Sequence, residues 1–146
     1  MNESQPAEKT VLIVENNSHA REALAALVDH RGYKAVTARD GAAALAMLAS
    51  WVNPGLIILD MLMPGLDGWQ FLDALRHSRH RNVPVIITSG VDLTDDWAFD
   101  HGCAAFLHKP LDEAELFAAI GRVMKFPDRR GDSESAATKN ESERCI

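Results

Sequence analysis

Residues 56–68 read Leu-Ile-Ile-Leu-Asp-Met-Leu-Met-Pro-Gly-Leu-Asp-Gly and carry the clearest indication of the fold. The first four residues form a short, continuous apolar run, which is typical of a strand buried on both faces of a parallel sheet. Asp60 ends this run, and proline and glycine follow within a few residues, which indicates a turn. In open α/β folds, ligands bind outside the carboxyl ends of the strands. Asp60 is therefore expected at the rim of a sheet, facing a crevice.

Outward from this stretch, short apolar runs alternate with amphipathic segments. The other predicted strands cover residues 9–14, 33–38, 83–88 and 105–107. Predicted helices begin near Ser18, Asp40, Asp67, Thr94 and Asp112, and the third is expected to run to Asn82. Strands that alternate with helices predict an α/β fold, in which helices cover both faces of a parallel sheet.

The length of 146 residues fits one domain, which we expect to span residues 9–126. Residues 1–8 are predicted to be a disordered N-terminus, and the polar residues 127–146 a disordered tail or linker stub. No DNA-binding or catalytic module is recognisable after residue 126. Output is therefore expected through a partner protein, unless the chain was cut from a larger regulator.

Charge and composition argue against several classes of protein. The net charge of −6 does not favour direct nucleic-acid binding by this chain. No apolar run approaches 18 residues, so no membrane span is expected. The two cysteines lie far apart, which argues against a disulfide framework and favours a reducing, cytoplasmic location.

Polar side chains end four of the predicted strands. Because all carboxyl ends of a parallel sheet lie on one edge, these side chains are expected to gather there. They are Glu15 and Asn16, Asp60, Thr88 and Ser89, and Lys109. One or two such residues would arise easily by chance, but the full set is much harder to explain that way.

With these residues in place, the chain resembles the receiver domain of two-component response regulators. The matching pieces are residues 11–16, residues 60–68 as D-x-x-M-P-x-x-D-G, residues 84–89 and residues 106–110. The resemblance covers about residues 8 to 126. It implies a flavodoxin-like (βα)5 three-layer sandwich, with a five-stranded parallel sheet of order 2-1-3-4-5.

The resemblance also implies a phosphorelay chemistry. Asp60 would be the phosphoacceptor, taking a phosphoryl group from a histidine kinase or a histidine phosphotransfer protein. Mg²⁺ would be bound by Glu15, Asp60 and the backbone carbonyl of Leu62, and Asn16 occupies a position that touches the metal in the family.

The same resemblance assigns the residues that bind the phosphoryl group. Lys109 would pair with it as a point charge, and Thr88, with Ser89 beside it, would donate a hydrogen bond. Phe106 occupies the aromatic switch position, whose side chain changes rotamer when the threonine moves.

Two departures from the family pattern bear on function. The usual pair of acids after the first strand is Glu15-Asn16 here, so one charge is lost and weaker Mg²⁺ binding is expected. The positions two residues after Asp60 and Thr88, which can orient a hydrolytic water, are Leu62 and Gly90. A slowly decaying phosphorylated form is therefore expected.

Features outside this set have simpler interpretations. His77 and His80 lie in an arginine-rich stretch, interpreted as a solvated basic helix end, and Cys103 is interpreted as a small, partly buried residue. Trp97 and Phe99 belong to the predicted short fourth helix. In the family, that helix, the fifth strand and the last helix form a face for homodimers and output proteins.

Other functions remain open on the sequence. Asn16 favours a pseudo-receiver, an interaction module that works without phosphorylation. An enzyme is not expected, because phosphatases with an aspartyl nucleophile commonly carry a second acid two residues on, where this chain has Leu62. A dinucleotide-binding enzyme is disfavoured, since no G-x-G-x-x-G follows the first strand.

Overall fold

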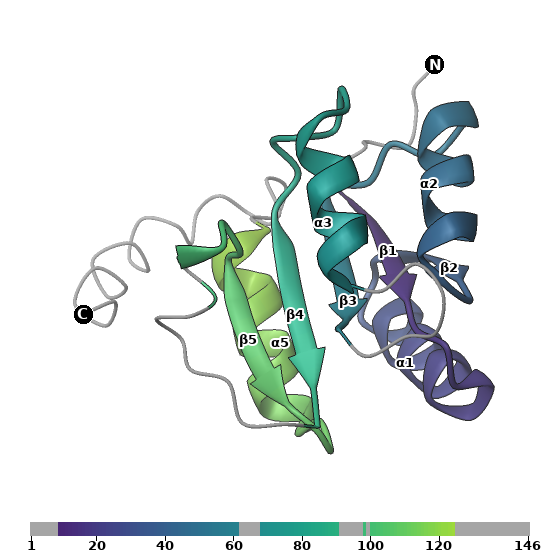
Figure 1. Ribbon diagram of the computed structural model, residues 1–146. Coiled ribbons are helices and arrows are strands. Elements are labelled where there is room, and N and C mark those ends of the chain that lie inside the picture. The colour runs from purple at the N-terminus through teal and green to yellow at the C-terminus, as the bar shows by residue number, and fades with distance from the viewer. Residues whose placement is uncertain (1–8, 62–67, 91–97, 99, 125–146) are drawn as a thin grey trace, which may run out of the picture.

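The computed structural model describes residues 9–61, 68–90, 98 and 100–124 (Figure 1). Its strands form one five-stranded sheet of order β2-β1-β3-β4-β5, and every pairing is parallel. The strands are β1 (Thr10–Val14), β2 (Lys34–Ala38), β3 (Leu56–Asp60), β4 (Val85–Ser89) and β5 (Ala105–His108). The helices are α1 (Ser18–His30), α2 (Gly41–Ser50), α3 (Gly68–Arg76) and α5 (Glu113–Val123). The predicted flavodoxin-like fold and its strand order are confirmed.

Two separate apolar cores lie on the two faces of the sheet. Alternate strand residues such as Leu12 and Ile57 pack with α2 and α3, whereas Val11 and Ile58 pack with α1 and α5. Figure 1 shows these two helix layers on opposite sides of the sheet. Because both faces are covered, the strands are continuous apolar runs rather than alternating ones.

Helix starts are set by short polar side chains. Asn17, Asp40 and Asp112 each accept a hydrogen bond from the backbone N–H three residues on, at 2.8, 2.8 and 2.9 Å. Such N-caps satisfy a donor that the helix leaves unpaired. The helices predicted to begin near Asp40 and Asp112 do so, with these two residues as their N-caps. For α1, which was predicted to begin near Ser18, the N-cap is Asn17.

The end of α3 differs from the prediction. The helix stops at Arg76, six residues before Asn82, and turns bonded within residues 74–83 follow it. Strand β4 also starts at Val85 rather than residue 83. The strand starts later because Pro84 has no N–H to donate to a neighbouring strand. Its carbonyl only accepts a hydrogen bond, from the Ile57 N–H at 3.0 Å.

The interpretation of His80 as part of a solvated helix end was wrong. His80 is only 7% exposed, and its Nε2 lies 3.0 Å from the Leu48 carbonyl oxygen. Arg79 donates to the same oxygen at 3.2 Å. The two side chains thus satisfy a carbonyl near the end of α2, where helices leave acceptors unpaired. His77, by contrast, is exposed as expected.

Several predictions fall on residues outside the described ranges. They concern the two terminal segments and the fourth helix, of which Ala98 and Asp100 are described and helical. Trp97 and Phe99 also lie outside. Gly102, which follows this segment, has φ +79°, a left-handed conformation that suits glycine. None of the helices within the described ranges is long and apolar enough to span a membrane.

Candidate functional site

Three charged side chains converge at the carboxyl edge of the sheet, toward which the arrowheads in Figure 1 point. Glu15 follows β1, Asp60 ends β3 and Lys109 follows β5. The Lys109 Nζ lies 2.9 Å from Glu15 Oε1 and 3.3 Å from Asp60 Oδ2. Both carboxyl residues are buried, at 5% and 6% exposure. The expected gathering of these three residues is therefore present.

The environment of Lys109 favours its charged form. Burial, the largest single influence on its pKa, favours the neutral amine, but it is outweighed by the hydrogen bond to Glu15 and the charges of Asp60 and Glu15. The net result is that the pKa of Lys109 is raised above its ordinary value. The site therefore holds a fixed positive charge at neutral pH, beside two carboxylates.

The turn after β1 is held by a network of hydrogen bonds. The Asn17 N–H donates to Glu15 Oε2 at 3.0 Å, so both oxygens of that carboxylate have partners. Arg21 of α1 donates through Nη1 to the Glu15 carbonyl at 3.0 Å and to the Asn16 carbonyl at 3.4 Å. Sequence reasoning missed Arg21. A signal existed, since helical side chains lean toward the N-terminus of their helix and a first-turn arginine can reach the preceding turn.

Thr88 and Ser89 are placed by β4. Thr88 pairs with Asp60 in the parallel register, and both Thr88 and Ser89 are buried. The Thr88 hydroxyl donates to the Leu59 carbonyl at 3.5 Å, which is long for such a bond. The hydroxyl is therefore weakly held beside Asp60.

The remaining predicted site residues differ in what the structure says of them. Phe106 is half-buried against the core on the α2 and α3 side of the sheet, with its ring centroid 6.3 Å from that of His108. Asn16 is exposed in the turn after β1, and Gly90 is exposed after β4. Leu62 lies outside the described residues.

The chemistry of the donor set suits a small, hard cation. Two buried carboxylates, Glu15 and Asp60, face the same ammonium group. Mg²⁺ commonly takes one or two carboxylates and keeps several waters, so these residues fit it. Within the described ranges, no group of three or more His, Cys, Asp or Glu residues could hold a metal.

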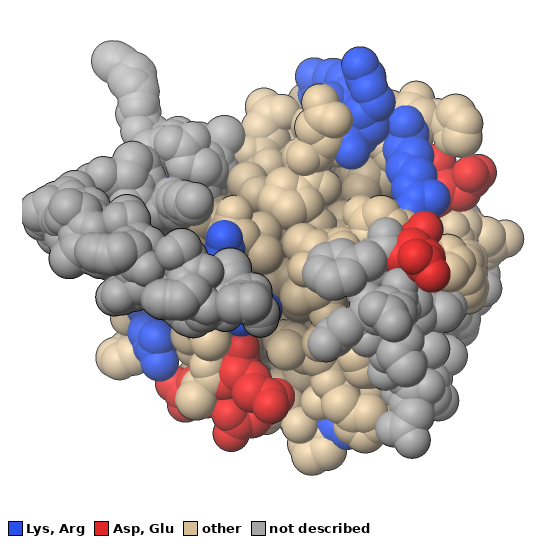
Figure 2. All heavy atoms as spheres, turned by 90° about the vertical axis from the view of Figure 1, so that its left-hand side faces the viewer, with Lys and Arg blue, Asp and Glu red and all other residues tan. Residues whose placement is uncertain are grey.

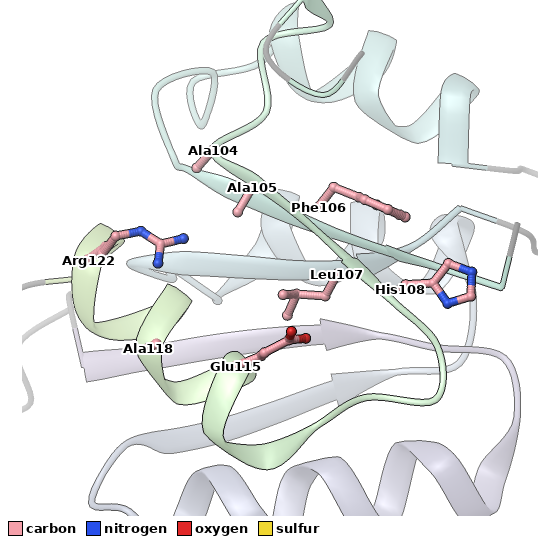
Figure 3. A pocket seen from close by; sticks show the side chains of 8 residues that line it. All are labelled: Ala104, Ala105, Phe106, Leu107, His108, Glu115, Ala118 and Arg122. Atoms are coloured by element: carbon pink, nitrogen blue, oxygen red, sulfur yellow. The ribbon is translucent and has the colours of Figure 1, made fainter. Parts of the chain in front are cut away.

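A separate cavity of about 450 Å³ lies between β5 and α5, away from these carboxylates (Figure 3). In Figure 3, Leu107 points toward α5, whereas Phe106 points to the other side of the strand. The cavity is lined by Ala104, Ala105, Phe106, Leu107, His108, Glu115, Ala118 and Arg122. Because Phe106 and His108 belong to β5, which Lys109 directly follows, this face is joined to the charged cluster through one strand.

Comparison with known proteins agrees with this geometry. The model of the response regulator receiver domain matches residues 11–121. The response regulator Rre1 of Synechocystis is 31% identical over 89% of this chain and 58% of its own length. Protein PilH of Pseudomonas aeruginosa is 31% identical over 78% of this chain and 96% of its own length. Several other relatives are longer, and the chain spans 26% of the response regulator PleD of Caulobacter vibrioides.

A solved structure gives the same result. The receiver domain of the Francisella response regulator 1452 superposes with a TM-score of 0.72 at 29% identity, covering 80% of this chain and 96% of that one. The chain therefore belongs to the receiver-domain family of two-component response regulators.

Proposed function

We propose that this receiver domain accepts a phosphoryl group on Asp60 from the phosphohistidine of a histidine kinase or phosphotransfer protein, and signals by protein contact. The observation that carries the proposal is the pairing of Lys109 with both Glu15 and Asp60 at the carboxyl edge of the sheet. Chemistry on an aspartate needs cationic partners for the incoming charge, and Lys109 is such a partner.

Each residue has a role that its position supports. An oxygen of Asp60 would form the new P–O bond as the P–N bond of the phosphohistidine breaks, with the imidazole as leaving group. Lys109 would then pair with a phosphoryl oxygen. Thr88, whose hydroxyl is weakly held next to Asp60, is free to turn toward another oxygen, with Ser89 beside it. Phe106 would follow that movement as the switch residue.

Mg²⁺, when bound, would supply charge neutralisation for the phosphoryl oxygens. Glu15 and Asp60 would hold it, together with the carbonyl of Leu62 and the amide of Asn16. The loss of one charge at position 16 supports weak binding. The proposal describes a signalling module rather than an enzyme, and Leu62 is not an acid that would support a phosphatase.

A second function is favoured by one observation. Glu15 is already paired on both carboxylate oxygens, with Lys109 and the Asn17 N–H, and position 16 carries no charge. A pseudo-receiver that needs no phosphate would keep such a paired site. Asp60 remains buried beside Lys109, however, and this favours phosphorylation.

Contacts with output proteins are proposed for the face that carries β5 and α5. Figure 2 views this side, on whose described part uncharged surface lies between separate basic and acidic groups. The cavity on this face is lined by apolar residues such as Leu107 together with Glu115 and Arg122, a mixture of apolar and polar groups that interfaces between proteins commonly carry. A homodimer through this face is a second arrangement of the same contact.

Incubation with acetyl phosphate and Mg²⁺, followed by intact mass measurement, tests the proposal. The expected result is one phosphoryl adduct, absent in Asp60→Ala and in the isosteric Asp60→Asn. Wild-type protein without an adduct, but with retained partner binding, would support the pseudo-receiver instead. Circular dichroism of both variants shows whether the fold is kept.

A further inference from the structure

Arg21 holds the turn that presents Glu15 to the site. Its Nη1 donates to two successive carbonyls, those of Glu15 at 3.0 Å and Asn16 at 3.4 Å. These two peptide groups set the direction in which the Glu15 side chain leaves the end of β1. A planar guanidinium with several fixed donors suits such a double contact, whereas an ammonium group is a single point charge.

The turn is closed on its other side by the backbone. The Asn17 N–H donates to Glu15 Oε2 at 3.0 Å, and the Asn17 side chain caps α1 through the Ala20 N–H at 2.8 Å. Arg21 lies one residue beyond that cap contact and also bonds its own N–H to the Asn17 carbonyl at 2.9 Å. Helix α1, the turn and the Glu15 carboxylate therefore form one connected set of hydrogen bonds.

We propose that Arg21 is a positioning residue of the phosphorylation site, which orients residues 15–17 so that the Glu15 carboxylate faces Lys109 and Asp60. This inference rests on the proposed function. It matters in this chain because position 16 is an amide, so among the described residues the acidic half of the site consists of Glu15 and Asp60. Arg21 itself touches no reacting atom.

The first test needs neither Mg²⁺ nor a phosphodonor. Amide hydrogen exchange of the full chain is measured by NMR for Asn17. Ala43 serves as an internal reference, because its N–H also donates to a side-chain carboxylate, that of Asp40, at 2.8 Å. Arg21→Met should raise Asn17 exchange relative to Ala43 about fivefold, the equivalent of one hydrogen bond. Arg21→Lys should restore part of the protection.

Arg39→Met is the matched control. Arg39 also follows a strand at the carboxyl edge, but it pairs with Asp40 at 3.8 Å and its side chain is 77% exposed. This variant loses the same charge and should leave Asn17 exchange unchanged. Equal Asn17 exchange in Arg21→Met and Arg39→Met would overturn the inference.

The second test separates positioning from general damage. In Arg21→Met, the Mg²⁺ concentration that gives half-maximal phosphorylation should rise about fivefold, while the rate at saturating Mg²⁺ is kept. Calorimetric Mg²⁺ titration should show the same shift. An unchanged Mg²⁺ requirement would overturn the inference, as would equal loss of rate at all Mg²⁺ concentrations. If wild-type protein neither binds Mg²⁺ nor is phosphorylated, the proposed function fails, and the exchange test still decides whether Arg21 orients Glu15.

Discussion

Lys109 and Glu15, 94 residues apart in the chain, form an ion pair of 2.9 Å. In the sheet order, β3 and β4 separate the strands that these residues follow. At a strand spacing of about 4.8 Å, three steps amount to roughly 14 Å. The two side chains must therefore both extend inward over the rim, and Asp60 lies where they meet.

Replacement of Lys109 by methionine should destabilise the domain at neutral pH. It leaves two buried carboxylates without their shared cation, and we expect a loss of about 1–3 kcal/mol in the free energy of unfolding. Because folding raises the pKa of Lys109, its contribution is complete below the pKa in the unfolded chain, near 10.4. It is then lost as the pH rises through the higher folded pKa.

Urea unfolding between neutral pH and strongly alkaline pH measures this effect. The gap between wild type and Lys109→Met should narrow only above about pH 10.4. Arg39→Met, which breaks an exposed pair, should cost under about 1 kcal/mol. A constant gap across the alkaline range would contradict the role given to the Lys109 charge.

Asn16→Asp should strengthen Mg²⁺ binding. One added charge within a few ångströms of the cation is worth on the order of 1–2 kcal/mol after screening, or about tenfold in affinity. Calorimetry at constant ionic strength measures it. Asn17→Asp is the matched control, since it adds the same charge one residue later on a side chain that caps α1. Equal affinities of wild type and Asn16→Asp would rule the idea out.

Gly68→Ala should distort the base of the segment that follows Asp60. An added Cβ would lie 2.5 Å from Met61 Sδ and 2.8 Å from Met61 Cα, and the backbone atom cannot yield easily. We expect a loss of about 1–3 kcal/mol, typical of overpacking. Gly121→Ala in α5 has open space around the new atom, so it should gain up to about 1 kcal/mol from helix propensity. Thermal unfolding of both variants tests whether Gly68→Ala lowers the stability of the domain and Gly121→Ala raises it.

The Cys103 thiol should be nearly inert in the folded protein. It is 3% exposed, and burial raises its pKa to about 11, against the lowering effect of nearby Arg76. Thiolate is the reactive form, so alkylation at pH 8 should proceed only as fast as the protein opens. The Cys145→Ser variant isolates Cys103 for this measurement. Rapid labelling without denaturant would show that the thiol is accessible.

Much of the fold was predictable because its signals are local. A run such as residues 56–60 needs two covered faces, and the turn residues that follow Asp60 end the strand there. Parallel pairing then places the ends of β1, β3, β4 and β5 on one edge, and this is why the sequence pattern predicts the charged cluster. The helix starts near Asp40 and Asp112 were likewise predictable from the local sequence.

Contacts between distant segments were not predictable in this way. The burial of His80 depends on a carbonyl of α2, and the end of α3 at Arg76 depends on the turn that follows it. The two hydrogen bonds that Arg21 donates depend on the path of the chain after β1. A residue's type and spacing predict its element and its edge of the sheet. They do not specify which of several reachable partners a long side chain takes, because that choice depends on register, rotamer and packing together. The amino-acid pattern thus determines which residues gather at the site. Only the tertiary structure determines that Lys109 pairs with both Glu15 and Asp60.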